Sequence, residues 1–198
     1  MDSRIAAVLI LVGLGGGPTG CAPNRNVFGD LSTPYHKALN SMTRERSFFD
    51  VDQVKYLTTV TYETKELQQA YVEEYAKRYE LPPDKKNEML ARQLAETRDY
   101  DVFFVSHFTS DRKSARITAD PNVWRLTLSN DPSGQTVEEP FSVTPMTSND
   151  PVLQYFHPYV THWSKTFRVK FKSLGEGPYR QLRMTGVVAQ LAFVWNPP

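Results

Sequence analysis

The four histidines, at positions 36, 107, 157 and 162, are the side chains in this sequence best suited to acid–base or metal chemistry. A metal site needs donors that converge from a rigid scaffold. His157 and His162 are separated by a stretch that contains Pro158, which is poor geometry for holding one ion. His107 lies in an apolar run and is expected to be a hydrogen-bonded core residue. The sequence therefore predicts no metal site and no cofactor.

A hydrolase triad can be drawn from Ser106, His107 and either Asp111 or Asp150. However, no serine lies in the glycine-flanked elbow that exposes a nucleophile above a sheet. Adjacency in sequence is also no evidence for a triad, because triads are defined by their geometry in space. We therefore predict no catalytic residue and rank hydrolysis as the third hypothesis for function.

A row of cations is the first candidate binding surface. Arg168, Lys170 and Lys172 alternate with the apolar residues of 167–171, which is the pattern of a half-buried strand. The three cations therefore share one face, and Arg183 can extend the row from another strand. This face either receives an acidic or anionic partner, or it is a solvated face that keeps the strand soluble and discourages edge pairing.

Two aromatic groups are candidate ligand-binding residues. Tyrosines recur every fourth position along one predicted helix face, and a second group lies in the irregular segment 155–163. The candidate residues are Tyr71, Tyr75, Tyr79, Tyr159 and Trp163. Their alternative role is packing, with the tyrosine hydroxyls reaching water and the aromatic segment sealing one end of the domain.

The first half of the chain combines helices with strands. Thr33 and Pro34 predict a helix start, and the apolar spacing continues this helix to about Arg46. Phe48 and Phe49 are then expected to wedge into the core. A two-residue alternation predicts a strand over 54–62, and the segment 64–98 reads as a helical hairpin.

The second half of the chain reads as strands. The apolar run 102–108 predicts a strand covered on both faces. Further strands are expected over 124–128 and 167–171, with a return strand at 136–143. The last strand, 182–195, is expected to carry a bulge at Gly186. The count favours an α+β fold, an antiparallel β-sandwich of about six to seven strands with an N-terminal helix and a helical hairpin insertion.

Composition and the amino-terminal segment predict where the chain is located. The 198 residues carry a formal net charge of +1, which argues against a nucleic-acid-binding protein. The apolar run 5–14 is shorter than a membrane-spanning helix and is typical of a secretory signal. We expect a signal peptide at 1–20, a tether at 21–30 and a single globular domain at 31–198.

The end of this segment, Pro18-Thr19-Gly20-Cys21, resembles the lipobox of bacterial lipoproteins. The resemblance implies that Cys21 is acylated and holds the chain to an envelope membrane. Ala22 stands where an Asp would favour retention in the inner membrane, so the resemblance implies an outer-membrane location facing the periplasm. The alternative is an incidental thiol beside an ordinary signal peptide. The globular domain itself resembles no family recognised from these motifs.

Two hypotheses for function therefore precede hydrolysis. The first is a non-catalytic lipoprotein that acts as a structural, assembly or protein-interaction component of the envelope. The second is a binding module for a lipid or a glycan. An apolar pocket containing polar groups favours the second hypothesis, whereas an exposed apolar patch or an open sheet edge favours the first. The identity of the partner and the oligomeric state stay open.

Overall fold

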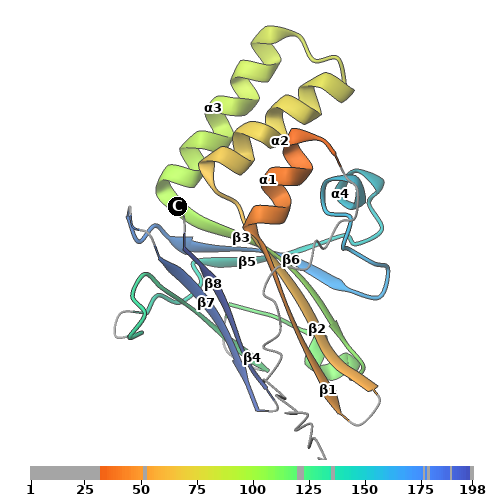
Figure 1. Cartoon of the computed structure of the whole chain (residues 1–198), viewed down its shortest axis with the longest axis vertical. Helices are drawn as coiled ribbons and strands as arrows, with labels where there is room; N and C mark the ends of the chain where they lie inside the picture. The colour runs from red at the N-terminus through yellow and green to blue at the C-terminus, as the bar shows by residue number, and fades with distance from the viewer. Residues whose placement is uncertain are drawn as a thin grey trace, which may run out of the picture.

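The computed structural model describes residues 32–50, 53–119, 123–134, 137–175, 177, 179–187 and 189–196. These residues form helices and two antiparallel sheets (Figure 1), so the predicted α+β class is confirmed. The described part of the chain contains eight strands rather than six to seven, divided five and three between the two sheets. Cys21 and the predicted signal and tether lie outside the described residues.

The larger sheet has the strand order β1-β2-β3-β6-β5. Its strands are β1 (Thr43–Asp50), β2 (Gln53–Tyr62), β3 (Tyr100–Thr109), β6 (Lys165–Lys172) and β5 (Ser142–Met146). Every neighbouring pair is antiparallel. β3 is central and buried over most of its length, as its continuous apolar sequence predicts.

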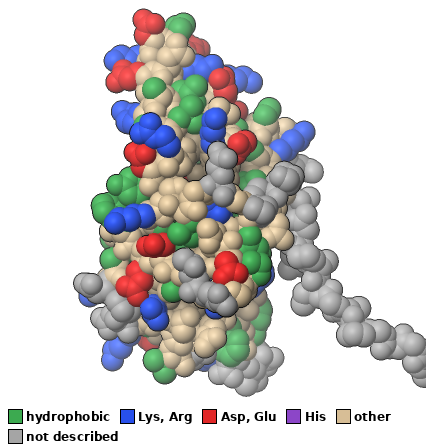
Figure 2. All heavy atoms as spheres, turned by 90° about the vertical axis from the view of Figure 1, so that its left-hand side faces the viewer, with side chains coloured by type: hydrophobic (Ala, Val, Ile, Leu, Met, Phe, Trp, Pro, Cys, Tyr) green, Lys and Arg blue, Asp and Glu red, His purple; other side chains and the backbone are tan. Residues whose placement is uncertain are grey.

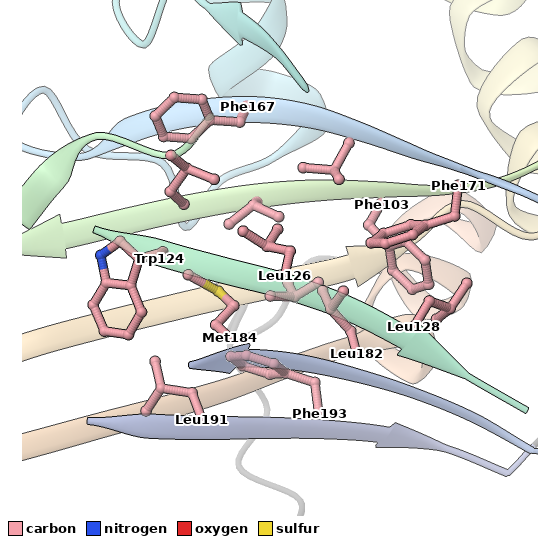
Figure 3. Close-up of a cluster of buried hydrophobic side chains, with 14 of the residues drawn as sticks. Phe103, Trp124, Leu126, Leu128, Phe167, Phe171, Leu182, Met184, Leu191 and Phe193 are labelled. Carbon is pink, nitrogen blue, oxygen red and sulfur yellow. The ribbon is translucent and has the colours of Figure 1, made fainter. Parts of the chain in front are cut away.

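The smaller sheet has the order β4-β7-β8, again antiparallel throughout. It is formed by β4 (Trp124–Ser129), β7 (Arg180–Gly186) and β8 (Gln190–Trp195). Buried side chains from both sheets form one apolar cluster, and Figure 3 shows them filling the space between strands of the two sheets. Its largest fully buried members include Trp124, Trp195, Phe103, Phe171 and Phe193.

The helices gather at one end of the molecule (Figure 1), over the face of the larger sheet that points away from the smaller one. They are α1 (Pro34–Met42), α2 (Lys65–Arg78), α3 (Pro83–Asp99) and the short α4 (Pro151–Phe156). The hydroxyl of Thr33 caps α1, as the predicted helix start requires, and that of Thr64 caps α2. A second apolar cluster lies in this layer and contains Tyr35, Leu39, Leu67 and Phe156.

The helices and strands are joined closely. α1 ends at Met42 and β1 begins at the next residue, while α3 ends at Asp99 and β3 begins at Tyr100. α2 follows β2 after two residues. The predicted helical hairpin 64–98 is present as α2 and α3. Among the described residues, no helix is long and apolar enough to span a membrane.

The expectation that α1 continues to about Arg46 is wrong. Residues 43–50 are extended because they pair with β2, starting from Thr43 opposite Thr61. The side chains of Phe48 and Phe49 are 41% and 58% exposed, so neither wedges into the core. The sequence marks this change only weakly, because Thr43 is followed by charged residues that suit either structure.

The expected single last strand is instead a hairpin of β7 and β8. Gly186 donates its N–H to the carbonyl oxygen of Ala189 at 2.9 Å and closes the turn. A Cβ at Gly186 would lie 3.0 Å from the indole of Trp124, so this close approach requires glycine. The expected return strand at 136–143 contributes an isolated bridge between Leu128 and Glu138, and β5 pairs with β6 instead.

A buried ion pair joins the two sheets at one end. Arg180 on β7 donates from Nε to Oδ1 of Asp101 on β3 at 3.2 Å, and both residues are 4% exposed. The hydroxyl of Tyr62 donates to the same oxygen, and the backbone N–H of Leu174 donates to Oδ2 at 2.9 Å. Further Arg180 N–H groups donate to the carbonyl oxygens of Tyr179 and Gly175. We call the group Asp101, Arg180 and Tyr62 the latch.

Candidate functional site

A cavity of about 230 Å³ lies between the helical layer and the larger sheet. α2 and α4 form much of its wall, and β3 and β6 contribute its floor. Most of its lining is apolar or aromatic, with a few polar side chains among them. The lining residues used below are Glu63, Leu67, Tyr71, Phe104, Leu153, Phe156, His157 and Arg168.

Arg168 is the centre of a charged cluster beside this cavity. Its Nη2 group donates to Glu63 at 2.6 Å and to Glu96 at 2.7 Å. Lys170 pairs with the other oxygen of Glu96 at 2.5 Å. We call Glu63, Glu96, Arg168 and Lys170 the cavity cluster; its two cations and two anions have no formal net charge.

The pKa values in the cavity cluster follow from this pairing. Burial alone would raise the pKa of Glu96, but hydrogen bonds from Arg168 and Lys170 outweigh it and lower that pKa. Burial also works against the charge of Arg168, yet Glu63 and Glu96 raise its pKa above the ordinary value. Glu96 and Arg168 therefore both keep their charges at neutral pH, and each cation of the cluster is paired with an anion.

His157 adds a neutral polar group to the cavity wall. It follows α4, and its ring is stacked on Phe104 with the ring centroids 3.8 Å apart and an angle of 7° between the planes. Part of the side chain remains accessible. Burial, together with the nearby Arg168, lowers the pKa of His157 to about 3. The imidazole is therefore uncharged at neutral pH. One of its two nitrogens donates a hydrogen bond and the other accepts one, depending on the tautomer.

The three tyrosines of the predicted helix face lie in different surroundings. Tyr71 lines the cavity, and burial followed by the neighbouring Tyr75 raises its pKa to about 12. Tyr75 stacks on Phe156 at a centroid distance of 5.9 Å. Tyr79 is 49% exposed and borders a separate hollow. Only one of the three predicted ligand-binding tyrosines therefore lines the cavity.

The other two aromatic candidates lie elsewhere. Tyr159 and Trp163 line a second hollow of about 220 Å³, beside residues of β2 and β3. Trp163 is 69% exposed, whereas the hydroxyl of Tyr159 is bonded to Thr61 at 2.7 Å. The two aromatic groups of the sequence therefore do not form one site.

The predicted basic row is likewise divided. Arg168 and Lys170 share one face of β6, as the alternation predicts, but both are paired with Glu96. Lys172 is exposed at the end of β6. Arg183 lies on β7 in the other sheet and donates to Gln181. Figure 2 shows acidic and basic side chains intermixed over the helical end of the face it presents.

The residues considered for a triad make other contacts. His107 is fully buried between Tyr56 and Trp124, with Nδ1 bonded to Thr58 at 2.8 Å. Asp111 and Asp150 cap helical turns. Among the described residues, no group of three His, Cys, Asp or Glu side chains is placed to hold a metal ion.

Sequence reasoning missed Glu63, Glu96 and the role of His157. Glu63 and Arg168 are 105 positions apart, and Glu96 and Arg168 are 72 apart, so no local pattern links them. One signal was present: a charged residue directly after the β-branched strand 54–62 is costly to bury without a partner. Comparison of the chain with models of protein families, curated proteins and solved structures finds no match.

Proposed function

We propose that the chain is a non-catalytic, lipid-anchored envelope protein whose folded part binds a small amphipathic molecule in the cavity. The cavity supports this proposal because it combines apolar and aromatic walls with a few convergent polar groups. This combination is typical of sites that bind small molecules. A perturbed histidine beside a compensated charge cluster adds to the support, because such groups concentrate at functional sites.

The cavity volume sets the size of the ligand. It is about 230 Å³, compared with the engineered cavity of roughly 150 Å³ that holds benzene. A molecule with one ring, such as a single sugar unit, or a short acyl segment therefore fits. In this proposal the two sheets form a sandwich that holds the helical layer in place, and the cavity lies outside the sandwich core.

Binding of two one-ring probes, phenol and anisole, tests the proposal. Both are titrated into the folded chain while the NMR signals of Tyr71 and Phe156 are followed. Leu153→Trp places an indole from α4 in the cavity and should weaken binding of both probes at least tenfold. Leu174→Trp is the matched control, because Leu174 packs against the other apolar cluster. The proposal fails if neither probe shifts the cavity signals, or if Leu153→Trp binds as tightly as the unmodified chain.

The anchor is tested separately. We expect the mature chain to begin at Cys21 and to carry fatty-acyl chains, which is measured by intact mass after extraction from membranes with detergent. Cys21→Ser should release the chain from the membrane fraction, because a single thiol carries the attachment. An unacylated mature chain that begins elsewhere would remove the lipoprotein part of the proposal and leave the cavity unaffected.

A protein partner is the second candidate function, favoured by a groove between β1 and β8. Each of them is one of the two outer strands of its sheet. At one end Arg44 donates to the carbonyl oxygen of Val194 at 3.0 Å, and the indole of Trp195 donates to that of Met42 at 2.7 Å. Beyond this closure the strands border a groove of about 630 Å³. An extended peptide can pair with such an edge.

Photo-crosslinking in the native envelope tests this second function. A photoreactive residue at Phe48, which lines the groove and is 41% exposed, should capture a defined protein. The same residue at Lys85, exposed on α3, is the control. Equal capture at both positions, or no capture at Phe48, would argue against a partner at this edge.

A further inference from the structure

A chain of buried hydroxyl groups leads from α1 to His157. Thr43 Oγ1 donates to the carbonyl oxygen of Leu39 at 2.7 Å, and it also contacts Thr61 Oγ1 at 2.7 Å. Thr61 Oγ1 contacts the hydroxyl of Tyr159 at 2.7 Å, and that hydroxyl contacts His157 Nδ1 at 3.1 Å. Thr43 and Thr61 are buried, so water does not compete with these contacts.

The order of donors along this chain follows from counting hydrogens, because each hydroxyl has one to donate. A carbonyl oxygen only accepts, so Thr43 donates its hydrogen to Leu39. Thr43 must then accept from Thr61, and Thr61 must accept from Tyr159. With its hydrogen used in this way, the oxygen of Tyr159 accepts from His157. The nitrogen Nδ1 of His157 therefore carries the proton.

The other nitrogen of His157 is the one left for a ligand. No hydrogen bond to Nε2 is present among the described residues, where His107 Nε2 is the only buried side-chain nitrogen or oxygen without a partner. Nε2 of His157 therefore remains accessible. His157 lines the cavity, whereas Tyr159, which is bonded to Nδ1, lines the second hollow.

We propose that the Thr43–Thr61–Tyr159 hydroxyl chain holds His157 as its Nδ1–H tautomer, so that Nε2 accepts a hydrogen bond from an uncharged ligand carrying an O–H or N–H group. This inference rests on the proposed function and narrows its ligand class. Thr61 and Tyr159 are positioning residues, since they act on the ligand only through His157.

The charges around the cavity agree with an uncharged ligand. Arg168 is held by Glu63 and Glu96, and Glu96 is shared with Lys170, so no net positive charge is left to attract an anion. Gln68 already donates to Glu63 at 2.8 Å. A ligand ring can pack against Tyr71 and Phe156 while its polar hydrogen reaches His157.

The tautomer is measured directly by two-dimensional ¹H–¹⁵N NMR of the histidine rings at neutral pH. We expect His157 to show a protonated Nδ1 and an unprotonated Nε2. Thr61→Val removes the acceptor of the Tyr159 hydroxyl. This hydroxyl can then donate to Nδ1, which favours the Nε2–H tautomer of His157. Thr61→Ser keeps the hydroxyl and should restore the original pattern. An Nε2–H tautomer in the unmodified chain would overturn the inference.

The ligand class is tested by the ratio of the phenol and anisole affinities. Phenol donates a hydrogen bond and anisole does not, although their rings are alike. Phenol should bind about tenfold more tightly to the unmodified chain, as expected for one hydrogen bond in a cavity. His157→Phe keeps an aromatic ring against Phe104 and should remove this preference, and Thr61→Val should remove or reverse it.

The outcomes separate the two proposals. If neither probe binds, the cavity function fails, and the NMR tautomer still decides whether the hydroxyl chain orients His157. If both probes bind the unmodified chain equally, or if a preference for phenol survives in His157→Phe, the cavity binds ligands but the inference about their polar group is wrong.

Discussion

Two arginines of this molecule are paired with carboxylates, one in the sealed latch and the other beside the cavity. In the latch, Arg180 and Asp101 are each 4% exposed and all contacts run between strands and the adjoining loop. In the cavity cluster, Arg168 meets two carboxylates beside an open space, with its side chain 23% exposed. The latch therefore serves to join the sheets, whereas the cavity cluster leaves polar groups where a ligand can reach them.

Removing the latch carboxylate should produce the largest effect. Asp101→Ala leaves the charge of Arg180 buried without a partner, so the free energy of unfolding should fall by about 3–5 kcal/mol. Urea denaturation measures this loss. Adding Arg180→Met removes the orphaned charge and should restore part of the stability. A loss below about 1 kcal/mol in Asp101→Ala would mean that the latch contributes little to stability.

The second largest effect is expected from acid, which should lower the free energy of unfolding through the buried His107. Burial lowers the pKa of His107 to about 4, so the unfolded chain takes up a proton at higher pH than the folded chain does. The contribution of neutral His107 to the free energy of unfolding is therefore fully present above about pH 6.5, and it is lost as the pH decreases towards 4. The loss from His107 should approach about 3 kcal/mol. A free energy of unfolding that stays constant between pH 6.5 and 4.5 would contradict this.

Single changes in the cavity cluster should cost less than loss of the latch carboxylate. Glu63→Gln should lower stability by about 2 kcal/mol, because a charged hydrogen-bond pair is lost while Glu96 still compensates Arg168. Glu96→Gln should cost less, since the side chain of Glu96 is 20% exposed and that of Glu63 is 9% exposed. Urea denaturation of both variants checks the order. A larger cost for Glu96→Gln would reverse this assignment.

The smallest effect is expected away from both clusters. Trp163 is 69% exposed, so Trp163→Ala should change the free energy of unfolding by no more than about 0.5 kcal/mol. Thermal and urea unfolding of this variant provide the reference for the other variants. A loss above about 1 kcal/mol would show that the aromatic segment seals the domain, which is the packing role predicted from the sequence.

Local patterns predicted the elements that depend on local physics. The alternation around Phe167, the apolar run of β3 and the caps at Thr33 and Thr64 each describe a residue and its near neighbours. The boundary at Thr43 was not predictable in this way, because pairing with β2 decides it. The β7–β8 turn was missed because Gly186 is compatible with both a bulge and a hairpin.

The candidate site was less predictable than the fold. Its polar groups come from segments that only the tertiary structure brings together, such as Glu63 after β2 and Arg168 on β6. The sequence singled out Tyr71 and Arg168, but it offered no reason to place them at one cavity. The sequence argued against His157 as a metal ligand but suggested no other role, whereas the structure shows it stacked on Phe104 and bonded to Tyr159.

The direct joins between helices and strands bear on how the cavity can change shape. α3 passes into β3 between Asp99 and Tyr100, and only two residues separate β2 from α2. Because these junctions have few or no linker residues, a tilt of the helices would strain the sheet beneath them. We therefore expect a ligand to enter a preformed space and to spend little of its affinity on rearranging the protein.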